Sequence, residues 1–307
     1  MCYIKFVKKL FSGIKEFENI SKAIKEGTLP NAILVVCPDS ETNKQFAQEV
    51  CSSFFCAEKS ACGNCEGCVK TEKETNPDLI VYPKEKAFQV ADAKEIVENA
   101  ILSPMIFSEK IYLIHNIDLA TVPAQNKILK VLEEPPASVK FLITCTNETK
   151  VLPTIISRCV KVNLMQLEKH RVQEFLGQEA TQNFNNAYDY GEGYLGKTIF
   201  ALENKQFEGL NSLAEDIIYN LKSSKEIISL SSKISKNKEQ FLIILNLLQV
   251  KFRKILEIGT EGYSKLCVVC ILDAILQIQK EVESNVLINL QADNLLMKIL
   301  ECKYLYK

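Results

Sequence analysis

The chain has little of three things: net charge, histidine and long uncharged apolar segments. Its 307 residues include 37 Lys and Arg against 38 Asp and Glu, which gives a formal net charge of −1. This balance supplies no general electrostatic reason to bind nucleic acid. No uncharged apolar stretch reaches the roughly 20 residues of a transmembrane helix, and the lysines among the first ten residues are not typical of a secretory signal. We therefore expect a cytoplasmic protein without a membrane span.

Histidine is scarce and cysteine is not. There are 2 histidines and 12 cysteines, and most of the cysteines sit in apolar runs, which favours a reducing compartment. Four cysteines form one cluster with five, two and two residues between successive members: Cys56, Cys62, Cys65 and Cys68. Pairs of the form C-x2-C supply thiolates for tetrahedral Zn²⁺ from a short loop. With no histidine nearby and no spare ligand, the pattern predicts a closed structural zinc site.

The order of apolar segments indicates an α/β fold. Short apolar runs at 32–36, 79–82, 110–115 and 140–146 are typical of buried strands, and helical periodicity separates them. This alternation favours a parallel sheet covered by helices on both faces. After about residue 164 the pattern is helical throughout, and a hydrophobic content of 47% is enough for two or three domains.

We predict a helix from about Lys44 to Phe55. In a nucleotide-binding protein, the phosphate-binding loop would lie between this helix and the strand at 32–36. The pattern G-x4-G-K-[ST] uses glycines to wrap phosphate, a lysine for the β- and γ-phosphates and a hydroxyl for Mg²⁺. This chain has other residues at the corresponding positions: Cys37, Thr42, Asn43 and Lys44. Both glycines are absent, so we expect no tight nucleotide binding and no ATP.

The strand at 110–115 also lacks the residues of an ATPase. A Mg²⁺-positioning carboxylate and a catalytic glutamate are expected at its end, but His115 and Asn116 stand there. Asp118 follows, and we interpret it as a cap or turn residue for the next helix. Together the two losses predict an NTPase-like frame without hydrolysis of its own.

Two longer motifs carry a family resemblance. The run 126–136 and the run 153–159, which ends in Ser157-Arg158-Cys159, resemble the AAA+ clamp-loader family, and the cysteine cluster is similar to the zinc module inserted in bacterial members. The resemblance covers residues 14–205. It implies an AAA+-like α/β domain with an inserted zinc loop (1–163), a small helical lid (164–205) and an all-helical collar for oligomerisation (206–307).

The same resemblance implies roles for individual residues. Arg158 of the SRC motif would project into the nucleotide site of a neighbouring subunit as an arginine finger, with Ser157 and Cys159 shaping the turn and the core. Lys197 would be the basic sensor residue of the lid. Many relatives have a longer gap before the second cysteine, so Cys51 is an alternative to Cys56 as first ligand.

The resemblance further implies an accessory, non-catalytic subunit of a DNA polymerase holoenzyme, which is a nucleotidyltransferase complex. Its partners would be the gamma/tau and delta subunits in a hetero-oligomeric ring, with a sliding clamp and primed DNA reached through the complex. One alternative is an ATP-hydrolysing motor subunit. Another is a zinc-dependent nucleic-acid-binding module.

Cys267 and Cys270, although spaced as C-x2-C, lie in an apolar run and are interpreted as core residues of a helix.

Overall fold

The computed structural model describes residues 9–84, 86–179, 181–234, 237–260, 262–283 and 288–306. The chain folds into two compact units. The first is Met1–Gln178 with Tyr194–Gly196, and the second is Glu179–Gly193 with Lys197–Lys307. The division into three domains stays a prediction, because the boundary between the two units splits the expected lid segment.

A five-stranded parallel sheet forms the centre of the first unit, in the order β2-β3-β4-β1-β5. The register aligns Leu34 of β1 with Ile143 of β4, and Tyr112 of β3 with Phe141 of β4. The strands are β1 (Ala32–Val36), β2 (Leu79–Tyr82), β3 (Lys110–Ile114), β4 (Val139–Cys145) and β5 (Val160–Asn163). The central strands are apolar and buried, as expected for a sheet covered on both faces.

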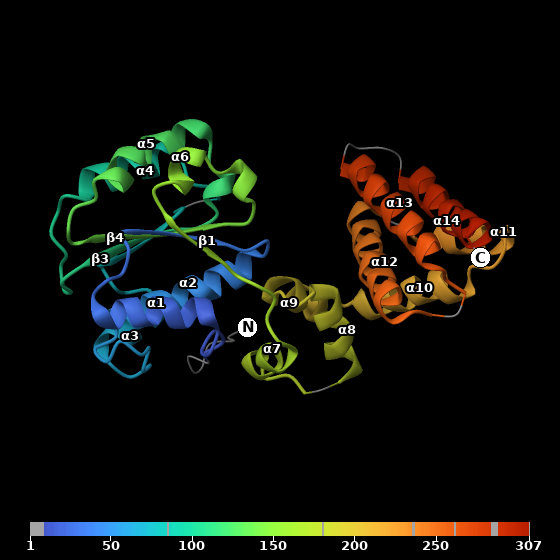
Figure 1. Ribbon diagram of the computed structural model, residues 1–307, viewed down its shortest axis with the longest axis horizontal. Coiled ribbons are helices and arrows are strands. Elements are labelled where there is room, and N and C mark those ends of the chain that lie inside the picture. Colours follow the sequence, from blue (N-terminus) through green and yellow to red (C-terminus); the bar gives the residue numbers. More distant parts are fainter. Residues whose placement is uncertain are drawn as a thin grey trace. The chain divides into compact units, whose positions relative to one another are not determined.

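Helices cover both faces of this sheet, as the sequence predicts. In Figure 1, α1 and α2 lie on one face, and α4, α5 and α6 lie on the other. The helices of this unit are α1 (Lys15–Glu26), α2 (Ser40–Phe55), α3 (Glu66–Glu72), α4 (Val90–Asn99), α5 (Val122–Glu133), α6 (Pro153–Ile156) and α7 (Lys169–Leu176), with 3₁₀ turns at Ile117–Leu119 and Glu148–Lys150. The AAA+-type α/β architecture is therefore present in the first unit.

Two details differ from the predicted elements. Strand β5 is not expected from the sequence, because its residues are mostly exposed at the sheet edge and Lys161 interrupts the apolar pattern. Helix α2 begins at Ser40, four residues before the expected start, because the side chain of Asp39 caps it by accepting the N–H of Thr42. Thr42, Asn43 and Lys44 therefore belong to the first turns of a helix, and the loop before it is short.

The second unit is helical. Its helices are α8 (Gln182–Gly191), α9 (Leu195–Glu203, whose first two residues belong to the first unit), α10 (Phe207–Asn220), α11 (Ser224–Ile234), α12 (Lys238–Ile258), α13 (Lys265–Glu283) and α14 (Ile288–Leu305). Helix α12 buries residues on several sides and packs with α10, α13 and α14 around one core. The family resemblance also predicts a last helix over residues 285–300; residues 285–287 lie outside the described part of the chain, and α14 begins at Ile288. None of the described helices is both long and apolar enough for a membrane span.

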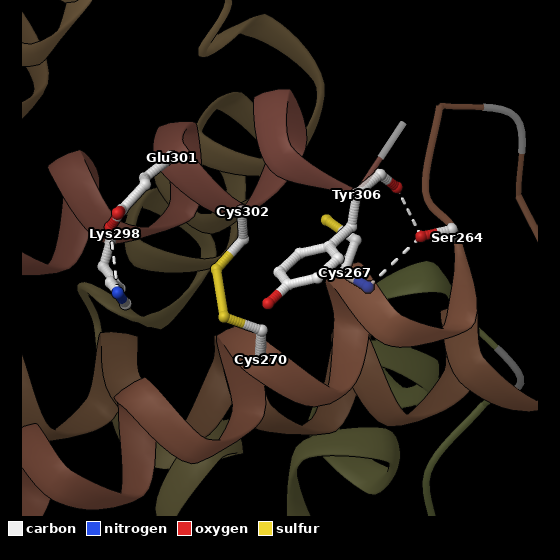
Figure 2. The surroundings of a disulfide bond; sticks show 7 residues. All are labelled: Ser264, Cys267, Cys270, Lys298, Glu301, Cys302 and Tyr306. Atoms are coloured by element: carbon white, nitrogen blue, oxygen red, sulfur yellow. Dashed lines mark hydrogen bonds and ion pairs between the residues drawn. A yellow bond between two sulfur atoms is a disulfide. The ribbon is translucent and has the colours of Figure 1, made fainter.

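Cysteine pairing in this unit corrects an expectation. Cys267 is a buried core residue of α13, as interpreted, but Cys270 is bonded to Cys302 of α14 in a disulfide, as Figure 2 shows. The sequence separation of 32 residues hides this partner. The two cysteines meet because α13 and α14 pack side by side, so the C-x2-C spacing of Cys267 and Cys270 is unrelated to the bond.

Candidate functional site

The cysteine cluster is the most compact group of metal-ligating side chains in the described residues. The Sγ atoms of Cys56, Cys62, Cys65 and Cys68 all lie within 4.8 Å of one another. Cys56 follows the last turn of α2 and Cys68 lies in α3. Cys51 is not in the group; it is fully buried in α2, and burial raises the pKa of its thiol to about 12.

The thiols converge because α3, which carries Cys68, packs against the end of α2, where Cys56 lies. Gly67 lies so close to the end of α2 that an added Cβ would be 2.0 Å from the carbonyl oxygen of Phe55. Burial alone raises the pKa of the Cys56 thiol, but N–H donors, first that of Cys62, outweigh this effect and lower the pKa to about 6. Four sulfur ligands at mutual contact distance fit one tetrahedral metal ion and leave no open position for a substrate. The cluster could therefore hold a metal ion in a structural role.

The phosphate-loop position is filled by the chain itself. Asp39 is 7% exposed, and its Oδ2 accepts hydrogen bonds from the N–H and the hydroxyl of Thr42 at 2.8 and 2.6 Å. Asn43 is fully buried, and its Nδ2 donates to the carbonyl oxygens of Cys37 and Cys145 at 3.0 and 2.9 Å. The residue in the lysine position of the motif therefore connects two strand ends, and a carboxylate occupies the helix N-terminus where a phosphate would bind.

The end of β3 carries His115 and Asn116 where an ATPase has carboxylates. Burial, with a smaller contribution from Lys44, lowers the pKa of His115 to about 4, so the imidazole is neutral at pH 7. Asn116 exchanges hydrogen bonds with the hydroxyl of Ser40. Asp118 is buried in the 3₁₀ turn Ile117–Leu119 and accepts hydrogen bonds from Thr146 and Asn147 after β4. It is therefore a turn residue, but it does not cap the next helix, α5, whose N-cap is Thr121.

The SRC motif follows helix α6. The Ser157 hydroxyl donates to the carbonyl oxygen of Thr154, and burial raises the pKa of the Cys159 thiol to about 11, so neither group is activated. Arg158 donates through Nη1 to the same carbonyl at 3.0 Å and through Nη2 to Glu133 Oε1 at 3.0 Å. Its Nε is buried and has no partner among the described residues. The Arg158 side chain is 29% exposed, and its guanidinium is only partly satisfied.

Glu133 is a functional candidate that the sequence analysis does not single out. It ends α5, its side chain is 59% exposed, and its carboxylate forms the ion pair with Arg158. The residues lie 25 positions apart, so the pair is visible only once α5 and α6 pack together. Its signal in the sequence is the Glu133-Glu134-Pro135-Pro136 segment inside the first family motif.

Lys197, the predicted sensor, belongs to the second unit. Its Nζ lies 4.0 Å from Glu192, whose carboxylate also accepts a hydrogen bond from Arg253 at 2.6 Å. The structure therefore groups the predicted residues into separate sets: the four cysteines, the Cys37–Asn43 pair, Arg158 with its motif, and Lys197 with Glu192.

Comparison with known proteins identifies the family. Residues 14–168, half of the chain, match the profile of the family described as DNA polymerase III, delta subunit. The chain belongs to this family of DNA polymerase III clamp-loader subunits, which are AAA+ proteins.

Individual relatives match over shorter or weaker stretches. The chain is 35% identical over 121 residues to the DNA polymerase III subunit tau/gamma of Haemophilus influenzae, which covers 39% of this chain and 18% of the relative. It is 28% identical over 203 residues to subunit gamma of Buchnera aphidicola subsp. Schizaphis graminum, covering 64% of this chain and 53% of that one. The chain therefore spans less than two thirds of the length of these curated relatives.

Among solved structures, a gamma subunit-related protein of Thermotoga maritima aligns with a TM-score of 0.47 at 19% identity. That alignment covers 94% of this chain and 100% of that chain.

Proposed function

We propose that the chain is the delta-prime, stator-like subunit of the bacterial DNA polymerase III clamp loader. The observation that carries this proposal is the occupied phosphate position. Asp39 and Asn43 use their polar groups within the chain, and β3 ends in a neutral His115 instead of a metal-binding carboxylate. Such a subunit binds no ATP of its own, and any part in hydrolysis is played at another subunit's site.

Arg158 is the group that acts on that neighbouring site. A planar guanidinium in trans neutralises charge that develops on a transferring γ-phosphoryl group. The ion pair with Glu133 is partly exposed, and such pairs are worth about 0–1 kcal/mol. Arg158 therefore exchanges this partner for a phosphate at little cost, and the unpaired Nε gains an acceptor when it does.

The wider assignment follows from the family. We propose a hetero-oligomeric ring with gamma/tau and delta subunits, which opens a sliding clamp and places it on primed DNA in the cytoplasm. The chain is then an accessory part of a nucleotidyltransferase complex and not an enzyme by itself. Zn²⁺ is the proposed ion of the Cys56–Cys68 cluster, and the second unit supplies the collar, with Lys197 in the lid.

A gamma/tau-like motor subunit is the second candidate, because the curated relatives described above carry gamma or tau names. It requires nucleotide binding by the isolated chain. Titration of the isolated protein with a fluorescent ATP analogue and Mg²⁺ separates the two candidates, since binding at micromolar concentration favours the motor and contradicts the stator.

The arginine is tested by ATP turnover of motor subunits reconstituted with delta, clamp and primed DNA. The wild-type chain is expected to raise turnover, and Arg158→Ala is expected to assemble without raising it, because an arginine finger contributes roughly 10³-fold or more at its own site. Lys161→Ala is the matched control, since it removes a nearby surface cation that pairs with Glu148. If Arg158→Ala and Lys161→Ala both behave as wild type, Arg158 is structural.

A further inference from the structure

The buried carboxylate of Asp39 lies at the start of two helices. Its Oδ2 accepts the N–H and the hydroxyl of Thr42 in α2, and it also accepts the N–H of Gly196, the second residue of α9, at 2.8 Å. The segment Tyr194–Gly196 belongs to the first unit, as Asp39 does. One carboxylate oxygen therefore satisfies donors from segments more than 150 residues apart in the sequence.

Thr42 extends this connection. Its hydroxyl donates to Asp39 and accepts the N–H of Leu195 at 3.0 Å, and both Thr42 and Leu195 are buried. At the next position a Cβ on Gly196 would lie 2.6 Å from Asp39 Oδ1 and 2.9 Å from the Cβ of Glu41. A side chain at position 196 would therefore displace the segment, so the contact depends on glycine there.

The donors involved are those that usually bind anions. The first N–H groups of a helix have no partners within the helix and carry partial positive charge, which makes a helix N-terminus a binding site for phosphate. Here the starts of α2 and α9 share one carboxylate that the chain itself supplies. Because Asp39 is 7% exposed, this carboxylate is not displaced without moving the backbone around it.

We propose that Asp39 is a built-in substitute for a nucleotide phosphate, which holds the segment Tyr194–Gly196 against the start of α2 when no nucleotide is bound. The inference deepens the proposed function, because a subunit whose phosphate position is filled needs no nucleotide to keep this segment in place. It does not involve Arg158. Nucleotide would accordingly have no effect on the segment in the wild-type chain.

The test measures amide hydrogen exchange at Leu195 and Gly196 in the isolated full chain, at single-residue resolution. Asp39→Ser keeps a good N-cap for α2 but is too short to reach Gly196. A hydrogen bond to a charged group is strong enough that its loss is expected to accelerate exchange of these two amides by at least about tenfold. Amides of β1 are expected to keep their wild-type rates, which shows that the domain remains folded.

The second arm adds inorganic phosphate or ATP with Mg²⁺. The wild-type rates are expected to stay unchanged, whereas either anion is expected to slow exchange again in Asp39→Ser. Glu41→Gln is the matched control, because it removes an exposed charge from the same helix turn and leaves the hydrogen bond from the Gly196 N–H to Asp39 in place. Asp39→Asn, which keeps the side-chain shape, is expected to give an intermediate rate.

Two results would overturn the inference. Wild-type exchange at Leu195 and Gly196 in Asp39→Ser means that the carboxylate does not hold the segment. Faster exchange that neither phosphate nor ATP reverses means that Asp39 is an ordinary cap and not a phosphate substitute. Neither result depends on the turnover assay with Arg158→Ala, so failure of the arginine-finger proposal is recognised separately.

Discussion

At the residue scale, Glu49 couples the stability of the first unit to pH. It is 2% exposed on α2 and accepts the backbone N–H groups of Leu10 and Phe11 at 2.9 and 3.2 Å. Burial outweighs these donors and raises the pKa of Glu49 from 4.5 to about 7. Because the pKa is higher in the folded chain, this contribution to stability is complete below about pH 4.5 and is lost as the pH rises towards 7.

We therefore predict that Glu49→Gln flattens the pH dependence of unfolding. Between pH 5 and 8 the wild type is expected to lose up to about 3 kcal/mol from this group relative to the variant, measured by urea unfolding at several pH values. His115→Gln serves as a control of opposite sign. In the wild type, the pKa of His115 is about 4, below the usual 6.5. The neutral imidazole therefore contributes stability above pH 6.5 that is lost as the pH falls towards 4. Parallel pH curves for Glu49→Gln and wild type would contradict the prediction.

At the element scale, Gly67 decides whether α3 can pack at the end of α2. The Cβ of Gly67→Ala would lie 2.0 Å from a backbone oxygen, which cannot move aside as a flexible side chain does. With Zn²⁺ as the proposed ion of the cysteine cluster, we predict that Gly67→Ala binds less metal per chain, measured by a colorimetric chelator, and has a lower melting temperature. The lower melting temperature reflects overpacking, which reduces the free energy of unfolding by about 1–3 kcal/mol.

The matched control for Gly67→Ala is Gly209→Ala in α10, where an added Cβ meets nothing within 4 Å. Gly209 lies in the first turn of α10, and alanine there is expected to stabilise the chain by up to about 1 kcal/mol and to leave the metal content unchanged. If both variants keep wild-type zinc content, the cysteine loop tolerates the displacement of Gly67 and the close approach is not essential.

The helices and strands that the sequence predicts correctly are those that depend on local patterns. Local patterns are sufficient for β1 to β4 and for the grouping of the four cysteines, because the spacing of apolar residues and of cysteines is a property of short segments. The predicted start of α2 is wrong because the prediction leaves out the N-cap that the side chain of Asp39 supplies. The Glu133–Arg158 pair and strand β5 depend on packing between distant segments, which no local pattern contains.

At the scale of the whole molecule, the chain has two units with separate cores and a disulfide in the second. The core of the first unit surrounds the sheet, and that of the second joins α10 to α14. The cysteine cluster belongs to the first unit, whereas the disulfide between Cys270 and Cys302 belongs to the second. A perturbation of either feature is therefore expected to lower the stability of its own unit.

We predict that Cys302→Ser lowers the urea midpoint of the second unit, which is followed by the helical signal at 222 nm. A cross-link that closes a loop of 32 residues stabilises a fold by up to about 4 kcal/mol through the entropy of the unfolded chain. A reductant is expected to produce the same shift in the wild type and no further shift in Cys302→Ser. A metal chelator is expected to act on the first unit instead, in both proteins. A wild-type midpoint that is insensitive to reductant would contradict the prediction, because the bond would then contribute nothing to folding.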